Sequence, residues 1–577
     1  MKDFWKMLLA VICGLFLFGF IAFFILFSSI NAAVNAGQKA KPVLPRSGIL
    51  AVDMSTIRLV EQPKAIPQFG MKGTVITDVP LLKAQQALRI AADDPAVKMI
   101  FLKTDGNLSS TASIEEFRKA LATFRKVSGK PVAAWIEAPT TGGYWLASVA
   151  DKVYMTEYQG GSSMFNGVSV QSIFLKDLLD KFGVNIQLIR HGKFKSAGEM
   201  YTRSESSAEN KLQTQEMVNS MWASIRADIA ASRGITEEAL DGAIDNLELC
   251  LPEDFLRAHL VDELMSRDEL KAKLATLSVE PSYSSVQFIP FPDYAEAKVL
   301  PDLKAKTKIA VLYADGNIVD APDPMNVSGN TFAAVIDRVR ADSSIKAVVL
   351  RVNSPGGSVL ASEKIKEELD LLGQEKLLVA SYGDYAASGG YWISNSCAKI
   401  FTDATTLTGS IGVFGMVPDL SKTAKKVLGV NVQATSSNRH GDMYSLMRPF
   451  DDAEYAYMLR SIETIYDKFT STVAEGRGMA KEKVDEIGQG RVWTGADALE
   501  INLTDEIGTL SDALSYAASA IDCSLESVQI AEFPEPLSPW EQFVQMLDGT
   551  TPEEVQFVRS FARPQVIARM PYQITVL

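Results

Sequence analysis

The sequence predicts an α/β protein made of two homologous halves that follow one N-terminal transmembrane helix. Three observations support this prediction: an uncharged run near the N-terminus, similar segments that recur about half a chain apart, and short β-branched runs that alternate with stretches of helical periodicity. The length of 577 residues is long for one domain and leaves room for two cores of ordinary size.

The first element is the uncharged run at residues 7–27, which Lys2 and Lys6 precede. About 20 apolar residues in a helix cross the hydrocarbon core of a bilayer, so we predict a transmembrane helix over about 7–30 and a linker up to residue 47. A cleaved signal peptide is the alternative, because residues 34–36 (VNA) fit a cleavage site. Without a second comparable run, the rest of the chain is expected on one side of the membrane.

The duplication is the second element. Gly-Gly-Tyr-Trp occurs at 142–145 and again at 389–392, 247 positions later (142 to 389). Three further pairs recur at nearly this spacing; they are 96–106 with 344–354, 182–187 with 428–433, and 259–264 with 502–507. Four pairs in near register indicate an internal repeat.

We therefore predict an N-terminal half at 48–300 and a C-terminal half at 301–577, with a joining stretch at 279–301 that contains Pro and Ser. Within the halves, runs such as KAVVLRV (346–352) are typical of buried strands, and periodic stretches such as 453–476 are typical of helices. This alternation favours α/β units with crossover connections.

Composition excludes several classes of function. The chain has 57 basic and 70 acidic residues, a net charge of −13, and no long run of either sign, which argues against a nucleic-acid partner. Of the four cysteines, Cys13 lies in the predicted transmembrane helix, and Cys250, Cys397 and Cys523 are far apart. This spacing fits neither a disulfide framework nor a zinc site, and we expect no metal and no cofactor.

The two halves differ at residues that could carry chemistry. The stretch 406–415, TLTGSIGVFG, places Ser410 between glycines, whereas the N-terminal half has YQGGSSMFNGV (158–168) at that place. Serine between glycines is also common in tight turns, so this stretch alone does not decide between a nucleophile and a turn residue. Ser163 is the gap-free counterpart of Ser410, but the flanking glycines are not repeated.

A lysine-containing stretch occurs only in the N-terminal half. Residues 188–200, LIRHGKFKSAGEM, contain Lys193 and Lys195, and Lys195 aligns with Gly441 of the C-terminal half. A serine needs a base to attack a carbonyl group, and a lysine can be that base when burial lowers its pKa toward neutrality. A histidine base in a Ser-His-Asp triad is the alternative; the chain's three histidines are His191, His259 and His440.

An acyl-transfer site also needs hydrogen-bond donors for the oxyanion. The amide of Ile411, directly after Ser410, is one candidate donor. The turn NSPGGSV (353–359) follows a predicted strand and offers the amides of Gly356 and Gly357. The N-terminal half has no double glycine at the corresponding place, so the candidate oxyanion turn belongs to the half that contains Ser410.

Together these residues resemble the signal peptide peptidase A (protease IV) family, in its long, membrane-anchored, duplicated bacterial form. The resemblance rests on FKSA, RVNSPGGSV, AASGGYWIS, TLTGSIGVFG and GRVWTGADAL (490–499), which occur in the order typical of that family. It implies two tandem Clp-protease/crotonase-like α/β domains and a Ser-Lys dyad, with Ser410 as nucleophile and Lys195 as general base. The hydroxyl group that would orient the lysine is left open among Thr435, Ser436 and Ser437.

The resemblance also implies a biological setting. It predicts a single-pass protein of the bacterial inner membrane with its catalytic part on the periplasmic side, assembled as a homotetramer, that degrades signal peptides left after secretion. Two alternatives remain from the sequence: a crotonase-like acyl-CoA hydratase or thioesterase, and a catalytically silent membrane scaffold on the same fold.

Overall fold

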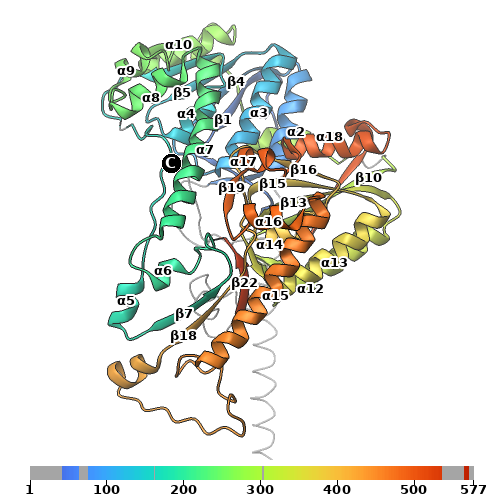
Figure 1. The fold of residues 1–577 in the computed structure, drawn as a ribbon. Helices are drawn as coiled ribbons and strands as arrows, with labels where there is room; N and C mark the ends of the chain where they lie inside the picture. Colours follow the sequence, from blue (N-terminus) through green and yellow to red (C-terminus); the bar gives the residue numbers. More distant parts are fainter. Residues whose placement is uncertain (1–41, 64–75, 162, 302–304, 536–564, 571–577) are drawn as a thin grey trace, which may run out of the picture. The chain divides into compact units, whose positions relative to one another are not determined.

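The computed structural model describes residues 42–63, 76–161, 163–301, 305–535 and 565–570 (Figure 1). The predicted transmembrane helix lies outside these ranges and stays a prediction. Among the helices within them, none combines the length and the apolar character that a membrane span requires.

The N-terminal half forms a six-stranded parallel sheet with the order β8-β6-β5-β4-β1-β9. Its strands are β1 (Gly48–Asp53), β4 (Val97–Lys103), β5 (Val132–Ile136), β6 (Lys152–Thr156), β8 (Glu263–Met265) and β9 (Phe288–Pro290). Its helices include α2 (Leu81–Asp93), α3 (Thr111–Ser128), α4 (Thr141–Ala147), α7 (Ala208–Arg233), α8 (Glu237–Asp245), α9 (Pro252–Arg257), α10 (Arg267–Leu277) and α11 (Phe291–Lys298). The central strand β5 is buried at every position, as expected of a parallel sheet covered on both faces.

The C-terminal half repeats this topology. Its strands β20, β16, β15, β13, β10 and β21 are neighbours in that order, and all these pairs are parallel. The strands are β10 (Lys308–Asp315), β13 (Ile345–Ser354), β15 (Leu377–Ala387), β16 (Lys399–Thr402), β20 (Glu506–Ile507) and β21 (Gln529–Phe533). Its helices within the described ranges are α12 (Gly329–Ala341), α13 (Val359–Glu375), α14 (Gly389–Ser394), α15 (Asp452–Arg477), α16 (Lys481–Ile487), α17 (Gly495–Glu500) and α18 (Leu510–Ala520).

The matching strand order confirms that the fold contains two parallel-sheet α/β domains. The two Gly-Gly-Tyr-Trp motifs occupy α4 and α14, directly after β5 and β15. The stretch at 279–301, which the sequence suggested as a joining segment, contains β9 and α11, and β9 pairs with β1 as β21 pairs with β10. This segment therefore completes the first sheet, because β1 needs a partner on its second edge.

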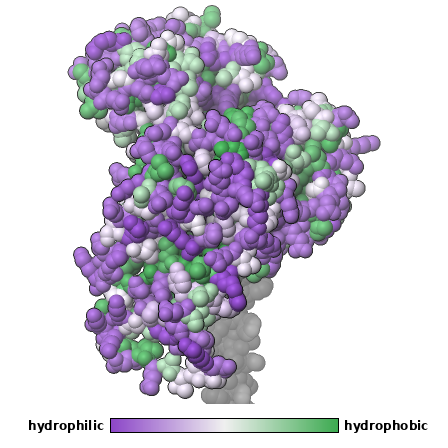
Figure 2. All heavy atoms as spheres, in the orientation of Figure 1, coloured by the Kyte–Doolittle hydropathy of each residue, from purple (hydrophilic) through white to green (hydrophobic). Residues whose placement is uncertain are grey.

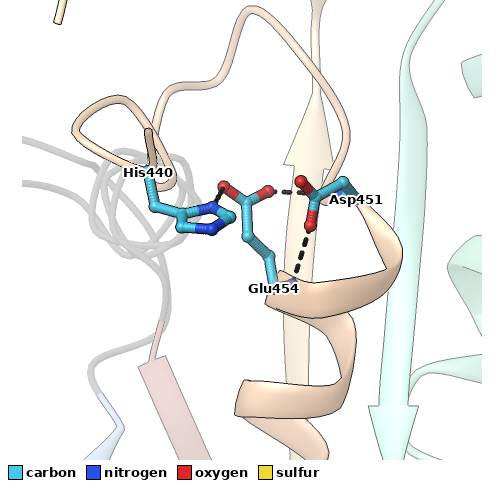
Figure 3. Close-up of side chains that lie close together, drawn as sticks. All are labelled: His440, Asp451 and Glu454. Atoms are coloured by element: carbon cyan, nitrogen blue, oxygen red, sulfur yellow. Dashed lines mark hydrogen bonds and ion pairs between the residues drawn. The ribbon is translucent and has the colours of Figure 1, made fainter. Parts of the chain in front are cut away.

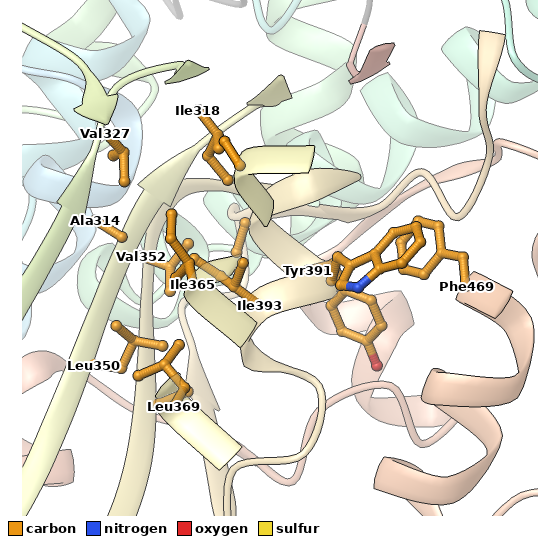
Figure 4. Packing of buried hydrophobic residues seen from close by; sticks show 14 of the residues in the cluster. Ala314, Ile318, Val327, Leu350, Val352, Ile365, Leu369, Tyr391, Ile393 and Phe469 are labelled. Atoms are coloured by element: carbon orange, nitrogen blue, oxygen red, sulfur yellow. The ribbon is translucent and has the colours of Figure 1, made fainter. Parts of the chain in front are cut away.

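A hydrophobic cluster of the C-terminal half supports the elements around the candidate site. Leu350 and Val352 of β13 pack with Ile365 and Leu369 of α13 in one cluster (Figure 4). In the same cluster, the ring of Trp392 stacks on Phe469 of α15, with ring centroids 4.4 Å apart. The Gly-Gly-Tyr-Trp motif of this half is thus anchored in the core.

A third sheet contains strands from both halves, in the order β12-β11-β14-β22-β18-β7. These strands are β7 (Asn185–Arg190), β11 (Ile318–Val319), β12 (Val327–Ser328), β14 (Gly356–Ser358), β18 (Phe414–Asp419) and β22 (Gln565–Arg569). β7 of the N-terminal half is antiparallel to β18 of the C-terminal half over six residue pairs (Figure 1). This pairing joins the segment that precedes Lys195 to the segment that follows Ser410.

The segment 428–433, whose sequence is similar to residues 182–187 at the start of β7, has a different conformation. Residues 428–433 lie in an irregular stretch that extends to about residue 441, and positions 431–440 are all exposed. Val430 and Val432 are among the exposed apolar side chains, and Figure 2 shows apolar residues in scattered patches on a largely hydrophilic face. The two copies of this sequence therefore form different structures.

Candidate active site

Ser410 directly follows β17 (Leu407–Gly409), a strand that pairs with β15 on one side and β19 (Val492–Thr494) on the other. Its φ is 49° and that of Gly409 is 73°, so two successive residues adopt the left-handed conformation. The Ser410 N–H donates to the Arg491 carbonyl at 2.7 Å, which holds this turn. A left-handed non-glycine residue fixed in this way is typical of functional sites.

Lys195 reaches Ser410 from the N-terminal half. Its Nζ lies 3.0 Å from Ser410 Oγ, 3.1 Å from the Ser410 carbonyl oxygen and 2.8 Å from Ser388 Oγ. Lys195, Ser388 and Ser410 are all fully buried. The structure thus brings together the serine and the lysine that the sequence placed in different halves.

Burial lowers the pKa of Lys195 well below its usual range, because the charged ammonium loses its hydration. The three polar contacts of Nζ are two hydroxyl groups and one carbonyl, none of which carries a negative charge. The ring of Phe414 lies 6.0 Å from Nζ. These surroundings favour the neutral amine, the form that accepts a proton.

The segment around Lys195 is fixed from several sides. The Phe194 N–H donates to the Gln489 carbonyl at 3.0 Å, and the Arg190 guanidinium donates to the Lys195 carbonyl at 2.7 Å. Gly490, with a φ of 83°, is so close that a Cβ at this position would lie 2.5 Å from Lys195 Cβ. The motif GRVW therefore begins with glycine because the lysine backbone packs directly against it.

Ser388 is the residue that sequence reasoning missed. It precedes α14 with a φ of 55°, and its N–H donates to the Gly409 carbonyl at 2.8 Å. The sequence predicts instead that the hydroxyl that orients the lysine belongs to Thr435, Ser436 or Ser437. That expectation is wrong in this structure: all three are exposed in the irregular stretch after residue 428, and the hydroxyl beside Nζ belongs to Ser388.

A sequence signal for Ser388 existed. It lies inside AASGGYWIS, one of the stretches that carried the family resemblance, and directly before the duplicated Gly-Gly-Tyr-Trp. A serine before a short helix is also typical of an N-cap, so the sequence alone does not indicate that the Ser388 hydroxyl contacts Lys195. In the structure Ser388 makes no side-chain capping hydrogen bond, which leaves its hydroxyl free for the lysine.

Neither Lys193 nor a histidine takes the place of Lys195. Lys193 is exposed, with its ammonium 5.2 Å from the Phe194 ring. The His191 ring stacks on Tyr466, with centroids 4.0 Å apart. His259 is a left-handed residue directly after α9, and His440 pairs with Glu454. Within the described ranges the alternative Ser-His-Asp triad is not assembled.

His440, Asp451 and Glu454 form the one cluster with metal-ligand geometry among the described residues (Figure 3). Its carboxylate groups already have partners. Glu454 accepts hydrogen bonds from Arg448 at 2.7 Å and from the Asp451 N–H at 3.0 Å, and Asp451 accepts from the Glu454 N–H. The two bonds between Asp451 and Glu454 form the capping box that begins α15, and the hydrogen bonds from Arg448 lower the pKa of Glu454 to about 2. The cluster is accounted for by its role at the helix N-terminus.

The predicted oxyanion donors lie on two segments. Ile411 is buried, and within the described part of the chain its N–H has no hydrogen-bond partner. Gly356 and Gly357 are buried in β14, and the Gly356 N–H donates to Ser354 Oγ at 3.2 Å. Gly389 packs against them so closely that a Cβ there would lie 3.2 Å from Gly356 Cα. Gly389, the first residue of the Gly-Gly-Tyr-Trp motif in the C-terminal half, thus packs against the turn that contains Gly356 and Gly357.

Buried charges from the N-terminal half hold the segment before Ser410. Glu115 of α3 accepts hydrogen bonds from the N–H groups of Ala404 and Thr405, both at 3.0 Å. Lys119, one turn later, lies between Glu115 and Asp403 at 2.8 and 3.0 Å. The turn that leads into β17 is therefore positioned by α3 of the other half.

Comparison with known proteins identifies the class. The sequence profile described as Peptidase family S49 matches residues 125–279 and 371–524, one segment in each half. The chain belongs to this family and is a duplicated serine peptidase.

Relatives of known description are similar over most of the chain. "Protease 4" of Haemophilus influenzae is 34% identical over 455 residues, which cover 76% of this chain and 72% of that protein. "Protease 4" of Salmonella typhi is 32% identical over 514 residues, which cover 86% and 82%. "Serine protease SPPA, chloroplastic" of Arabidopsis thaliana is 29% identical over 456 residues, which cover 77% and 66%. The chain is thus a homologue of protease 4.

Proposed function

We propose that the protein is a membrane-anchored endopeptidase in which Ser410 is the nucleophile and Lys195 the general base. The observation that carries this proposal is the 3.0 Å distance between Lys195 Nζ and Ser410 Oγ in a fully buried site. A neutral amine has two N–H groups and one lone pair. It can donate to Ser388 Oγ and the Ser410 carbonyl while it accepts from the Ser410 hydroxyl, which uses all three contacts.

The reaction proceeds in two steps. Ser410 Oγ attacks the peptide carbonyl carbon while Lys195 Nζ takes the hydroxyl proton, and the Ile411 amide with that of Gly356 or Gly357 stabilises the oxyanion. The C–N bond then breaks, and the leaving amine takes the proton from Lys195. Lys195 next removes a proton from water, which attacks the acyl ester. As the C–O bond to Ser410 breaks, Lys195 gives this proton to Ser410 Oγ, which releases the carboxylic product and restores the serine hydroxyl and the neutral amine. The mechanism requires no metal.

The substrate class and the location are parts of the same proposal. Remnant signal peptides are apolar and remain near the membrane, so an anchored peptidase would meet them there. The uncharged run at 7–27 supports the anchor, and the relatives include proteins described as "Protease 4" and a "Putative signal peptide peptidase SppA". We extend the proposal to a Clp-protease/crotonase-like form of the α/β fold, a homotetramer, and a catalytic part on the periplasmic side of the inner membrane.

Hydrolysis of an apolar peptide ester tests the chemistry. We expect Ser410→Ala and Lys195→Met to lower kcat by about 10³-fold or more, because each removes a member of one catalytic unit. Lys193→Met is the matched control, since it removes an exposed lysine two residues away. Activity retained in Lys195→Met and lost in His191→Ala would reject the lysine base, and turnover of acyl-CoA thioesters independent of Ser410 would favour the hydratase or thioesterase alternative.

A further inference from the structure

The C-terminal strand β22 lies between the two strands that flank the candidate site. It pairs antiparallel with β14, with Gly356 opposite Arg569 and Ser358 opposite Ile567. It also pairs antiparallel with β18, with Phe414 opposite Ile567. β14 carries the candidate oxyanion glycines, and β18 begins four residues after Ser410, so β22 fills the space between these two parts of the site.

No other edge of these two strands is open to a peptide among the described residues. β14 pairs with β11 on its other side, and β18 pairs with β7 on its other side. An extended peptide that adds to a sheet takes its affinity from main-chain hydrogen bonds along a free strand edge. A substrate that binds beside Ser410 in this way would need the position that β22 occupies.

β22 is also separate from the duplicated fold. The second family match ends at residue 524, and the last strand of the parallel sheet, β21, ends at Phe533. Six of the eight strands of that sheet have counterparts in the N-terminal half, and β22 belongs to a different sheet. Since the repeat is complete without β22, this strand is not needed to close the core of the domain.

The end of the strand lies close in register to the nucleophile. The Met570 N–H donates to the Pro355 carbonyl at 2.8 Å, next to Gly356. Continued from the pair Phe414 and Ile567, the antiparallel register with β18 places Met570 opposite Ile411. Met570 is only 3% exposed, so an apolar side chain is buried at this end of the strand.

We propose that residues 565–570 act as an intramolecular competitive inhibitor that occupies the position of an extended peptide substrate, with Met570 in the pocket for a substrate side chain next to the scissile bond. This inference rests on the proposed peptidase function. It specifies the substrate as a peptide bound antiparallel to both β14 and β18, with a medium-sized apolar residue near the cleaved bond. It also accounts for a catalytic pair with no exposed surface.

The test compares the full chain with Met570→Asp, which places a charge in a buried apolar position. If the strand occupies the groove nine-tenths of the time, the variant should lower KM for an apolar peptide ester about tenfold and leave kcat unchanged. A chain that ends at Arg569 should show the same direction of change. Val127→Asp is the control, because it introduces the same charge at a 65% exposed position of α3.

Direct binding separates this inference from the proposed function. A fluorescent peptide QVIARM, the sequence of 565–570, should bind the double variant Ser410→Ala, Met570→Asp more tightly than Ser410→Ala alone, and a scrambled peptide should bind neither. This readout needs no catalysis. Equal peptide binding by the two proteins, or an unchanged KM in both Met570→Asp and the shortened chain, would overturn the inference, whereas loss of hydrolysis in every protein with peptide binding intact would reject the peptidase mechanism alone.

Discussion

The two halves of the chain share one strand order and differ in what they contribute to the site. The C-terminal half has Ser410 after the strand β17. At the corresponding place of the N-terminal half, the described residues of 158–168 form no strand, and Met164 makes an isolated bridge with Thr140. The N-terminal half instead has β7 and Lys195, where the C-terminal half has an exposed irregular stretch. The two halves share the order of six strands, and each half contributes one member of the proposed catalytic pair.

The largest expected effect on kcat comes from a change at Gly490 of the C-terminal half, which contacts Lys195 of the N-terminal half. Gly490→Ala adds a Cβ that would lie 2.5 Å from Lys195 Cβ, so the lysine backbone must move. Because a displacement of about 1 Å can cost about 10²-fold in rate, we expect kcat to fall by that amount. Steady-state hydrolysis of the peptide ester measures it.

The control for Gly490→Ala is Gly129→Ala. Gly129 is also left-handed, with a φ of 64°, but no atom lies within 4 Å of its added Cβ. It carries the same backbone strain without the contact, and its kcat should match that of the unchanged protein. A Gly490→Ala variant as active as Gly129→Ala would show that the close packing is not needed for catalysis.

Ser388→Ala tests whether the hydroxyl of the second half orients the lysine. Removal of the group 2.8 Å from Nζ should lower kcat about tenfold or more, as for other residues that orient a catalytic group, and should move the midpoint of the pH–rate profile. The combined variant Thr435→Ala, Ser436→Ala, Ser437→Ala should leave both quantities unchanged. If the midpoint of the pH–rate profile does not move in Ser388→Ala, the role of Ser388 is structural and it does not orient the lysine.

The lowered pKa of Lys195 has consequences for stability as well as rate. In the folded state burial lowers the pKa of Lys195, so the amine loses its proton at a lower pH than in the unfolded chain, where the pKa is about 10.4. Between the folded and the unfolded pKa the unfolded state binds more protons, so the burial of this lysine lowers the free energy of unfolding by an amount that decreases as the pH rises through this window.

Lys195→Met should therefore have a higher Tm than the unchanged protein at neutral pH, although it is inactive, and the difference should shrink toward pH 10. Activity of the unchanged protein should fall as the pH is lowered through the pKa of Lys195 in the folded state, since protonation removes the base. Differential scanning calorimetry at several pH values measures the first effect. A Tm difference that grows as the pH rises would contradict the neutral lysine.

The smallest expected effect concerns the buried charges between the halves. Glu61 binds Arg351 through two hydrogen bonds, at 2.9 and 2.7 Å, and Arg351 also pairs with Glu116 at 2.6 Å. Burial outweighs the attraction of Arg351 and raises the pKa of Glu61 to about 7. Between about pH 4.3 and 7 the folded state therefore binds a proton that the unfolded state releases, and stability falls as the pH rises through this window.

In Glu61→Gln the decrease of the free energy of unfolding with rising pH, of the order of 3 kcal/mol, should be absent, because glutamine resembles the protonated acid. Urea unfolding at pH 5 and pH 7 measures the difference. Glu280→Gln, which alters a partly exposed pair with Lys98, is the control and should retain the pH dependence. If the free energy of unfolding of Glu61→Gln still decreases between pH 5 and pH 7, another buried carboxyl group binds the proton.

Comparison of the halves also shows how much the sequence could predict. The repeat followed from motifs present in both copies, and the α/β class followed from alternating strand-like and helical stretches. Ser410 and the two lysines became candidates because their motifs occur in one copy only, and the choice of Lys195 followed from the family resemblance. The antiparallel pairing of β7 with β18 did not, because register between strands distant in sequence is set by packing that no local pattern contains. The contact of Ser388 with Lys195 could not be predicted, because a serine before a helix is commonly an N-cap. The strand β9 could not be predicted either, because it lies in a stretch that contains many turn-forming residues.

The measurement closest to the central claim is the site of reaction with a serine-directed fluorophosphonate, located by mass spectrometry of the digested protein. The account predicts phosphonylation of Ser410 in the unchanged protein and in Lys193→Met, and at least a 10²-fold slower reaction in Lys195→Met. Labelling of a serine in the N-terminal half, such as Ser163, or an unchanged rate in Lys195→Met, would contradict a site completed by one residue from each half.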